Sequence, residues 1–481
     1  MIPKRQIPPD PIFPHMPTLC DEKAMKDIFE KHVGNGHRPD QGNWIQDCRI
    51  LHIRYKPGRY VMVLYEILFR NRPGQPDAPE MWYVRAFKKG KSHSNFLEAQ
   101  ALQTQERQPN PRILHFREIE SIAWGFPYDR KMVSLPNALD RDMLRSQVLP
   151  SLLGPQRAAE WDVVDLTSEV MHYVPEHTCT MRVTMHLHNR MTGETTSFTV
   201  FGKTFANHQG MLSYQALQQL WNSPARKLGA LVIPEPLAFD SETNTLWQSN
   251  LIGAPLTHFP LADPRMCGWM EKAGATLATL HGTPLEDLPL GQAPDIMERL
   301  NNAIGMLTPL RPPCQESLHE LSSVLAQQAR QFTSYPPATL HGDPHRKNLF
   351  LQDETVALID LDSITTGPPL YDVGSCLASV WYRVALGEIS TPLAKVLARS
   401  FLNGYQRSVA WPLSEFEVAW HIAVFLITEQ ASRCATTFKA ERLDIIDQLI
   451  QLAKALLVDG FLLNGTPLQS RDCLSIQSGT F

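Results

Sequence analysis

No stretch of the 481-residue sequence approaches the roughly 18 consecutive apolar residues that a membrane helix needs. Residues 1–9 also lack the apolar core of a signal peptide. The 45 Lys and Arg residues nearly balance the 49 Asp and Glu residues, and no basic stripe is visible. We therefore expect neither a membrane partner nor a nucleic-acid partner.

Cysteines at metal-binding spacings are absent as well. None of the eight cysteines belongs to a C-x-x-C pair, so no zinc site is expected. Buried, reduced thiols explain these cysteines best, and they favour a cytoplasmic location. With 43% hydrophobic and 20% charged residues, the chain has a globular composition, and its length predicts two or three domains.

The most informative segment that is present is residues 341–348, His-Gly-Asp-Pro-His-Arg-Lys-Asn. His341, Asp343 and Asn348 stand there in the pattern H-x-D-x4-N, which is the layout of a kinase catalytic loop. Phosphoryl transfer needs a carboxylate that orients or deprotonates the attacking hydroxyl group, and Asp343 is the candidate. Because an isolated H-x-D is common by chance, the assignment depends on the residues after Asn348.

Two short apolar runs, 349–351 and 356–359, come after this loop and enclose a polar tetrapeptide. The pattern predicts a β-hairpin whose second strand leads into Asp360. Since a hairpin brings its ends together, we expect Asn348 and Asp360 to be neighbours. Their amide and carboxylate oxygens suit Mg²⁺, so they are the candidate metal ligands. Together these features make phosphoryl transfer from a nucleotide the leading hypothesis.

Residues 338–374 resemble the aminoglycoside phosphotransferase family, also called the phosphotransferase enzyme family, a branch of the protein-kinase-like fold. The family pattern is H-G-D-x4-N, then I-D, a Gly and a later Asp, which correspond here to His341–Asp343, Asn348, Ile359–Asp360, Gly367 and Asp372. The resemblance implies an α+β, bilobal fold with a small antiparallel β lobe and a helical C-lobe. It implies Asp343 as the catalytic base, with Asn348 and Asp360 as Mg²⁺ ligands. His341 and Asp372 would support the catalytic loop.

One more acidic residue, Asp362, lies just beyond Asp360. It is either a further metal ligand or a solvated turn residue, and turn chemistry favours the second.

A small β lobe is expected upstream, with strands at 169–174, 179–188, 197–205, 231–239 and 245–252. Lys203 lies on the third of these strands, where kinases place the lysine that binds nucleotide phosphates. A solvated strand lysine is the alternative. The end of the fifth strand is expected to be the hinge that binds the nucleotide base through backbone groups, with Gln248, Asn250 and Ile252 as candidates.

Two features of a kinase small lobe are missing. No Gly-rich turn precedes Lys203, because the corresponding residues 174–178 are Val-Pro-Glu-His-Thr. Residues 204–234 contain no Asp or Glu to pair with Lys203. The long polar substitutes on the expected helix are Gln215, Gln218 and Gln219. A nucleotide-binding pseudokinase or regulatory module is therefore the alternative to an active enzyme.

The N-terminal part repeats the small-lobe pattern. Residues 55–59 resemble residues 173–177 at an offset of 118 (173 − 55 = 118), and the same offset places Arg85 on Lys203. Arginine is a poor substitute where a compact ammonium group is needed. We therefore predict three domains, namely a degenerate small-lobe-like cap domain at 1–150, a kinase-like N-lobe at 151–255 and a helical catalytic C-lobe at 256–475.

The resemblance implies a small-molecule kinase that transfers the γ-phosphate of ATP or GTP to a hydroxyl group of a sugar, amino sugar or amino alcohol, with Mg²⁺ as cofactor. The absence of an A-P-E segment after Asp360 favours a small acceptor over a protein. Helices after Asp372 would build the acceptor site. Its candidate contributors, each of which a core or surface position explains better, are Trp381, Tyr382, Trp420, His421 and Glu429.

Overall fold

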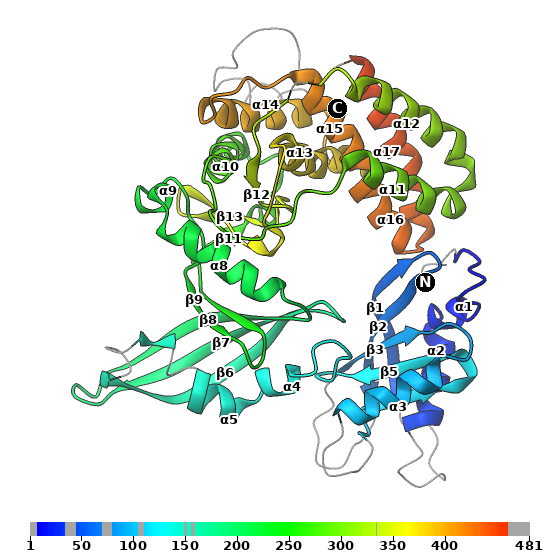
Figure 1. The fold of residues 1–481 in the computed structure, drawn as a ribbon, viewed down its shortest axis with the longest axis vertical. Helices are drawn as coiled ribbons and strands as arrows, with labels where there is room; N and C mark the ends of the chain where they lie inside the picture. Colours follow the sequence, from blue (N-terminus) through cyan, green and yellow to red (C-terminus); the bar gives the residue numbers. More distant parts are fainter. Residues whose placement is uncertain are drawn as a thin grey trace. The chain divides into compact units, whose positions relative to one another are not determined.

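The computed structural model describes residues 7–33, 45–69, 79–103, 110–148, 152–154, 159–332 and 334–459. These residues form two compact units (Figure 1). The first unit draws on Met1–Gly210, Ala238–Trp247 and Thr436–Ala440, and the second on Met211–Leu237, Gln248–Ala435 and Glu441–Phe481. Among the described residues, no helix is both long and apolar enough to span a bilayer. The predicted three-domain division stays a prediction.

The first unit starts with helices α1 (Met16–Leu19) and α2 (Glu22–Val33) and a five-stranded antiparallel sheet, drawn in blue to cyan in Figure 1. Its strands, in the spatial order β1-β2-β3-β5-β4, are β1 (Ile45–Lys56), β2 (Tyr60–Phe69), β3 (Glu80–Ala86), β4 (Ile113–Phe116) and β5 (Ser121–Gly125). Helix α3 (Ser92–Gln103) connects β3 to β4. The buried ring of Phe29 on α2 makes edge contacts with the rings of Tyr65, Trp82 and Phe116, which fixes α2 on the sheet.

A second set of elements comes next in the same order. Short helices α4 (Leu135–Ala138) and α5 (Arg141–Met143) precede a five-stranded sheet with the order β6-β7-β8-β10-β9. The strands are β6 (Trp161–Val174), β7 (Thr178–Asn189), β8 (Thr195–Phe205), β9 (Pro236–Asp240) and β10 (Thr245–Ser249), with helix α8 (Gln209–Asn222) between β8 and β9. The fourth predicted strand, 231–239, in fact begins only at Pro236, because Pro234 and Pro236 lack the N–H that a ladder needs.

Equal strand order and an equally placed helix indicate a structural repeat. We name residues 10–125 the first repeat and residues 129–249 the second repeat. In the ladders, Arg85 on β3 lies opposite Met62, and Lys203 on β8 lies opposite Thr180. Met62 and Thr180 are each the third residue of their strands, so Arg85 and Lys203 occupy the same position in the two sheets.

An aspartate closes the first hairpin of the first repeat. Asp10 Oδ2 accepts hydrogen bonds from the Tyr55 hydroxyl (3.0 Å) and from the Gly58 N–H (3.0 Å) in the β1–β2 turn. Its Oδ1 accepts from the N–H groups of Ile12 and Phe13.

The second repeat contains the same arrangement. Asp129 Oδ2 accepts from the Tyr173 hydroxyl (2.8 Å) and from the Glu176 N–H (2.9 Å) in the β6–β7 turn. Its Oδ1 accepts from the N–H groups of Lys131 and Met132. The repetition therefore extends from strand order to individual hydrogen bonds.

The second unit is mainly helical. Its long helices are α10 (Met266–His281), α11 (Ile296–Leu310), α12 (Gln315–Ala329), α13 (Leu370–Ala385), α14 (Thr391–Arg407), α15 (Glu415–Phe425) and α17 (Ala440–Asp459). Helices α10 and α14 pack closely, since a Cβ on Gly274 would lie 1.9 Å from the Phe401 carbonyl oxygen and one on Gly404 would lie 1.8 Å from that of Glu271. Sheets and helices together confirm the expected α+β class.

Two small sheets complete the second unit. One has the order β11-β13-β14, from β11 (Ala254–Pro255), β13 (Leu349–Gln352) and β14 (Thr355–Leu358). The other pairs β12 (Ala338–Leu340) with β15 (Thr365–Gly367).

Among the described cysteines, six are buried thiols outside disulfide bonds: Cys20, Cys48, Cys179, Cys314, Cys376 and Cys434. Cys267 is in a disulfide bond, so the expectation of reduced thiols is wrong at this position. Pairing depends on which sulfurs the fold brings together, which cysteine spacing alone does not reveal.

Candidate active site

The predicted hairpin forms directly after the catalytic loop. β13 and β14 pair in antiparallel fashion, with Leu349 opposite Leu358 and Gln352 opposite Thr355. At its open end, the Ile359 N–H donates to the Asn348 carbonyl oxygen at 3.0 Å. Asn348 and Asp360, the residue after Ile359, therefore lie beside each other at the base of the hairpin.

Asp343 lies in the loop between β12 and β13, and its side chain is 37% exposed. Two basic side chains lie close to its carboxylate: His345 Nε2 is 3.4 Å from Oδ2, and Arg433 Nη2 is 3.6 Å from Oδ1. Burial lowers the pKa of His345, although the charge of Asp343 acts in the opposite direction. Arg433 lies 90 positions after Asp343 (433 − 343), on helix α16 (Ser432–Thr436), and no local motif indicated it.

A buried carboxylate supports the start of this loop. Asp372, on the first turn of α13, accepts hydrogen bonds from the backbone N–H groups of His341 (2.6 Å) and Gly342 (3.1 Å). Its Oδ2 also lies 3.1 Å from Nε2 of the buried His281 on α10. Asp372 thus connects the loop to two helices of the second unit.

The loop backbone has little freedom to move. Gly342 has a φ of +83°, and a Cβ at this position would lie 2.2 Å from the Ser363 carbonyl oxygen, so only glycine fits. The buried His341 ring places Nε2 3.0 Å from the Ile359 carbonyl oxygen, which links the loop to the hairpin. Both contacts keep Asp343 and Asp360 on one rigid framework.

The two candidate metal ligands present suitable atoms. Asn348 Nδ2 donates to the Asp343 carbonyl oxygen at 3.0 Å, which leaves the amide oxygen as the atom to face a cation. Asp360 is exposed, in a left-handed conformation (φ +61°) just after the hairpin. Mg²⁺ commonly takes only one or two protein ligands and completes its shell with phosphates and water, so this pair fits. Asp362 is half-buried, so both interpretations of this residue, a further metal ligand or a turn residue, stay open.

The phosphate-binding candidate belongs to the first unit. Lys203 Nζ lies 5.8 Å from the centre of the Phe205 ring on the same strand. Two of the glutamines proposed as partners of Lys203 form hydrogen bonds with other residues of the second unit. Gln218 donates to the Tyr214 hydroxyl at 2.7 Å, and Gln219 makes two hydrogen bonds with the backbone of Glu286. Gln215 is the remaining candidate on α8.

The expected hinge lies at the end of β10. Ser249 is fixed by two hydrogen bonds to the Glu235 backbone, both at 2.9 Å, and Gln248 and Asn250 flank it. Ile252 is 79% exposed. Gly253 has a φ of +153°, and a Cβ there would lie 2.1 Å from the Leu351 carbonyl oxygen, so the hinge can approach β13 only with glycine. The nucleotide contacts of these residues stay predictions.

Four of the five candidate acceptor contributors have structural explanations. Trp381 and Trp420 are fully buried, and Trp420 Nε1 donates to the Leu325 carbonyl oxygen. Burial lowers the pKa of His421 to about 4, so this residue is neutral. The Tyr382 hydroxyl accepts from Arg442 at 2.7 Å.

Glu429 differs, because it lies in a π-helical segment, Leu426–Ala431, and close to Asp343. Its carboxylate accepts from Arg299 Nη2 (2.8 Å) and the Ser375 hydroxyl (3.0 Å). Burial raises its pKa, Arg299 and Arg433 oppose this shift, and the charge of Asp343 adds to it. π-Helical segments often occur at functional sites.

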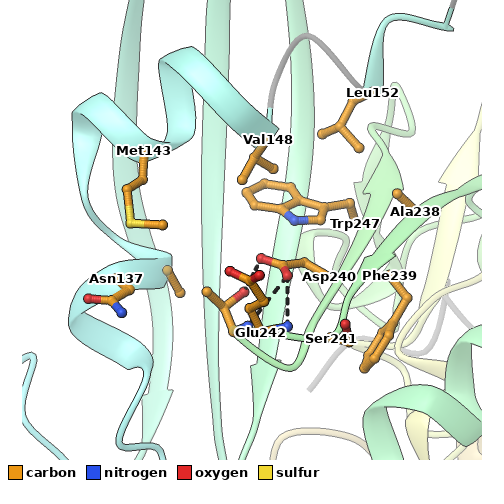
Figure 2. Close-up of a pocket in the computed structure, with 12 residues that line it drawn as sticks. Asn137, Met143, Val148, Leu152, Ala238, Phe239, Asp240, Ser241, Glu242 and Trp247 are labelled. Atoms are coloured by element: carbon orange, nitrogen blue, oxygen red, sulfur yellow. Dashed lines mark hydrogen bonds between the residues drawn. The ribbon is translucent and has the colours of Figure 1, made fainter.

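A cavity of about 320 Å³ lies in the first unit, between α4–α5 and the β9–β10 hairpin (Figure 2). Its lining includes Trp247 and the acidic residues Asp240 and Glu242. Asp240 is used structurally, since it accepts from the N–H groups of Glu242 and Thr243 and from the Thr243 hydroxyl, which closes the hairpin. None of the predicted site residues lines this cavity.

A family model confirms the resemblance that residues 338–374 indicate. Residues 214–408 match the model of the phosphotransferase enzyme family, which is about two fifths of the chain. The matched segment contains Asp343, Asn348 and Asp360. The match therefore supports an ATP-dependent phosphotransferase that acts on a hydroxyl group of a small molecule. A comparison with curated proteins finds no match.

Several solved structures are similar to this chain at low identity. A choline/ethanolamine kinase family protein from Mesorhizobium loti has 16% identity and a TM-score of 0.41, over 70% of this chain and 99% of its own. A choline kinase from Cryptosporidium parvum has 11% identity and a TM-score of 0.41, over 62% and 91%. An aminoglycoside phosphotransferase from Streptomyces rimosus has 17% identity and a TM-score of 0.34, over 51% and 89%. At these TM-scores the likenesses add nothing to the argument.

Proposed function

We propose that this protein is a small-molecule kinase that transfers the γ-phosphate of ATP or GTP to a hydroxyl group of a sugar, amino sugar or amino alcohol. The observation that supports this most is the catalytic loop. A half-exposed carboxylate, Asp343, and two suitable metal ligands, Asn348 and Asp360, lie on one rigid framework within the segment that matches the family. A cytoplasmic location and the absence of a nucleic-acid partner remain predictions.

In the proposed reaction, the Asp343 carboxylate accepts the proton of the acceptor hydroxyl group. The acceptor oxygen forms a bond to the γ-phosphorus while the bond to the β,γ-bridging oxygen breaks, and the nucleoside diphosphate leaves. Asn348 and Asp360 would hold Mg²⁺, which neutralises phosphate charge. Lys203 would bind the phosphates. Asp372 and His341 fix the loop, and His345 and Arg433 are close enough to orient the Asp343 carboxylate.

The test is release of nucleoside diphosphate by the purified full chain with MgATP or MgGTP and a panel of neutral, cationic and anionic hydroxyl compounds. Asp343→Asn should lower kcat by about 10²- to 10⁴-fold, which is the usual contribution of a general base. Asp353→Asn is a matched control, because Asp353 is exposed in the turn of the same hairpin, at φ +50°, where Asn is tolerated. Unchanged turnover in Asp343→Asn would show that the base is another residue.

The second candidate function is a nucleotide-binding module without turnover. It is favoured by the hydrogen bonds that Gln218 and Gln219 make to Tyr214 and Glu286, and by the lack of glycine in the β6–β7 turn. Calorimetric binding of MgATP, without diphosphate release for any acceptor in the panel, would support it over the kinase.

A further inference from the structure

The β6–β7 turn of the second repeat contains an unusual residue. Glu176 has a φ of +57°, a left-handed conformation that is unfavourable for a side chain, by about 1 kcal/mol or more. The corresponding residue of the first repeat is Gly58, with a φ of +64°. Although Glu176 is next to the tip of a hairpin, its side chain is only 3% exposed. Its surroundings must therefore stabilise it strongly.

Two arginines bind the Glu176 carboxylate. Arg130 approaches it in a bidentate manner, with Nε 2.7 Å from Oε1 and Nη2 2.7 Å from Oε2. Arg85 Nη1 lies 2.7 Å from Oε2. A third arginine, Arg54 of the first repeat, donates to the neighbouring Pro175 carbonyl oxygen at 2.9 Å. The turn of the second repeat is thus bound to β1 and β3 of the first repeat.

The backbone donors of the turn are also in use. Pro175 has no N–H, the Glu176 N–H donates to Asp129, and the His177 N–H donates to the Val174 carbonyl oxygen. In a kinase small lobe, the turn between the first two strands covers the nucleotide phosphates. Here the three central residues have no amide N–H to offer a phosphate.

We propose that Arg85 of the first repeat and Arg130 of the second repeat form an anion-binding position where the two repeats meet, and that Glu176 of the second repeat is its internal ligand. Arg85 occupies the strand position of Lys203, to which the proposed function assigns the nucleotide phosphates. At Arg85, a carboxylate of the same chain takes the place of a phosphate. The first repeat therefore holds the β6–β7 turn and binds no nucleotide, and the chain binds one nucleotide. Only this count rests on the proposed function.

The proposal predicts that removal of the carboxylate opens a site for a small oxyanion. Glu176→Gly is the suitable variant, because glycine accepts the left-handed φ and already stands at the corresponding position 58. Thermal unfolding of the full chain is measured with increasing sulfate at constant ionic strength. We expect a saturable rise in Tm of roughly 2–4 °C in Glu176→Gly. Wild type should show only the gradual stabilisation that sulfate gives to proteins in general.

Two further variants make the result specific. Glu176→Gly combined with Arg85→Gln should lose the saturable rise. Glu80→Gln is the matched control, because it breaks another half-buried pair of the first repeat, Glu80 with Arg112 at 2.7 Å, and should create no sulfate site. A saturable rise in wild type, or none in Glu176→Gly, would overturn the proposal. If Glu176→Gly does not fold, Glu176→Gln, Arg85→Gln and the double variant are compared in a double-mutant cycle. Additive effects of the two substitutions on Tm would then overturn the proposal.

A calorimetric titration with a non-hydrolysable ATP analogue completes the test. One nucleotide per wild-type chain is expected, and two would contradict the filled position at Arg85. Absence of nucleotide binding would refute the proposed function, while the sulfate experiment would still decide the anion-binding position.

Discussion

The two repeats of this chain share a fold but differ at the positions where a small lobe does chemistry. Both have the same strand order, the same intervening helix and the same aspartate that closes the first hairpin. At one ladder position, however, the first repeat has Arg85 and the second has Lys203. At the turn position, the first has Gly58 and the second has the buried Glu176. Backbone architecture is therefore a poor guide to which copy can bind a ligand, and the side chains decide it.

The two repeats also differ in the pKa of the aspartate that closes the first hairpin. In the first repeat the pKa of Asp10 is lowered, because its hydrogen bonds from Gly58, Ile12, Tyr55 and Phe13 outweigh the effect of burial. In the second repeat burial dominates and raises the pKa of Asp129, despite four corresponding hydrogen bonds. The same arrangement thus stabilises a charge in one copy and disfavours it in the other.

The largest expected difference between the repeats is in catalysis. Lys203→Met should lower kcat/KM for the nucleotide by about 10²- to 10³-fold, since removal of one preorganised group that stabilises charge has effects of this size. Arg85→Met should lower stability but leave kcat of the folded protein within about twofold. Steady-state kinetics and an unfolding curve for each variant provide the measurement. Equal losses of kcat/KM in both folded variants would remove the functional distinction.

The next largest effect is on stability at the contact between the repeats. Glu176→Gln should lower the free energy of unfolding by about 3 kcal/mol, because it leaves two largely buried arginines without a counter-charge. Glu80→Gln, which removes the counter-charge of one arginine, Arg112, should cost less, about 1 kcal/mol. Urea unfolding with hydrogen exchange in β1–β3 distinguishes them. If the two variants lose equal stability, the Glu176 contact is no more than an ordinary ion pair.

A smaller effect is expected at the turn of the first repeat. Gly58→Ala should lower the free energy of unfolding by about 1 kcal/mol, because of the left-handed φ alone, since no atom lies within 4 Å of the added Cβ. Gly58→Asn should lose less, because Asn tolerates this conformation. Urea midpoints of both variants test this, and a neutral Gly58→Ala would contradict the backbone argument.

The smallest effect concerns pH. Asp10 has a lowered pKa, so it adds stability above its unfolded pKa, near 3.8, and this stability is lost as pH falls through the folded pKa. Asp129 has a raised pKa, so its contribution is unfavourable at neutral pH and stability is lost as pH rises from about 3.8 through the folded pKa. Asp10→Asn should flatten the loss of stability in acid, and Asp129→Asn the loss on raising the pH. Unfolding free energies of both variants, measured from pH 3 to pH 7, test this prediction. If both variants change the pH dependence in the same direction, the assignment is wrong.

Much of the catalytic loop could be predicted because its signals are local. The hairpin after Asn348, the proximity of Asp360 and the α+β class arise from short patterns and strand pairing. The limits of strands β9 and β10 were less predictable: β9 begins only at Pro236, because prolines interrupt the predicted strand, and β10 ends at Ser249, before the predicted end at residue 252. The disulfide at Cys267 had no signal in the cysteine spacing.

The sequence by itself determined the candidate base, the candidate metal ligands and the existence of a repeat, since each depends on residue types at fixed short spacings or on a constant offset. Only the tertiary structure decided that Arg433 lies beside Asp343 and that Glu176 lies between Arg85 and Arg130. Arg433 and Asp343 are 90 positions apart, and Glu176 and Arg85 are 91 apart. Such contacts depend on how whole helices and sheets pack, because a side chain meets a distant partner only after the backbone of both elements is fixed.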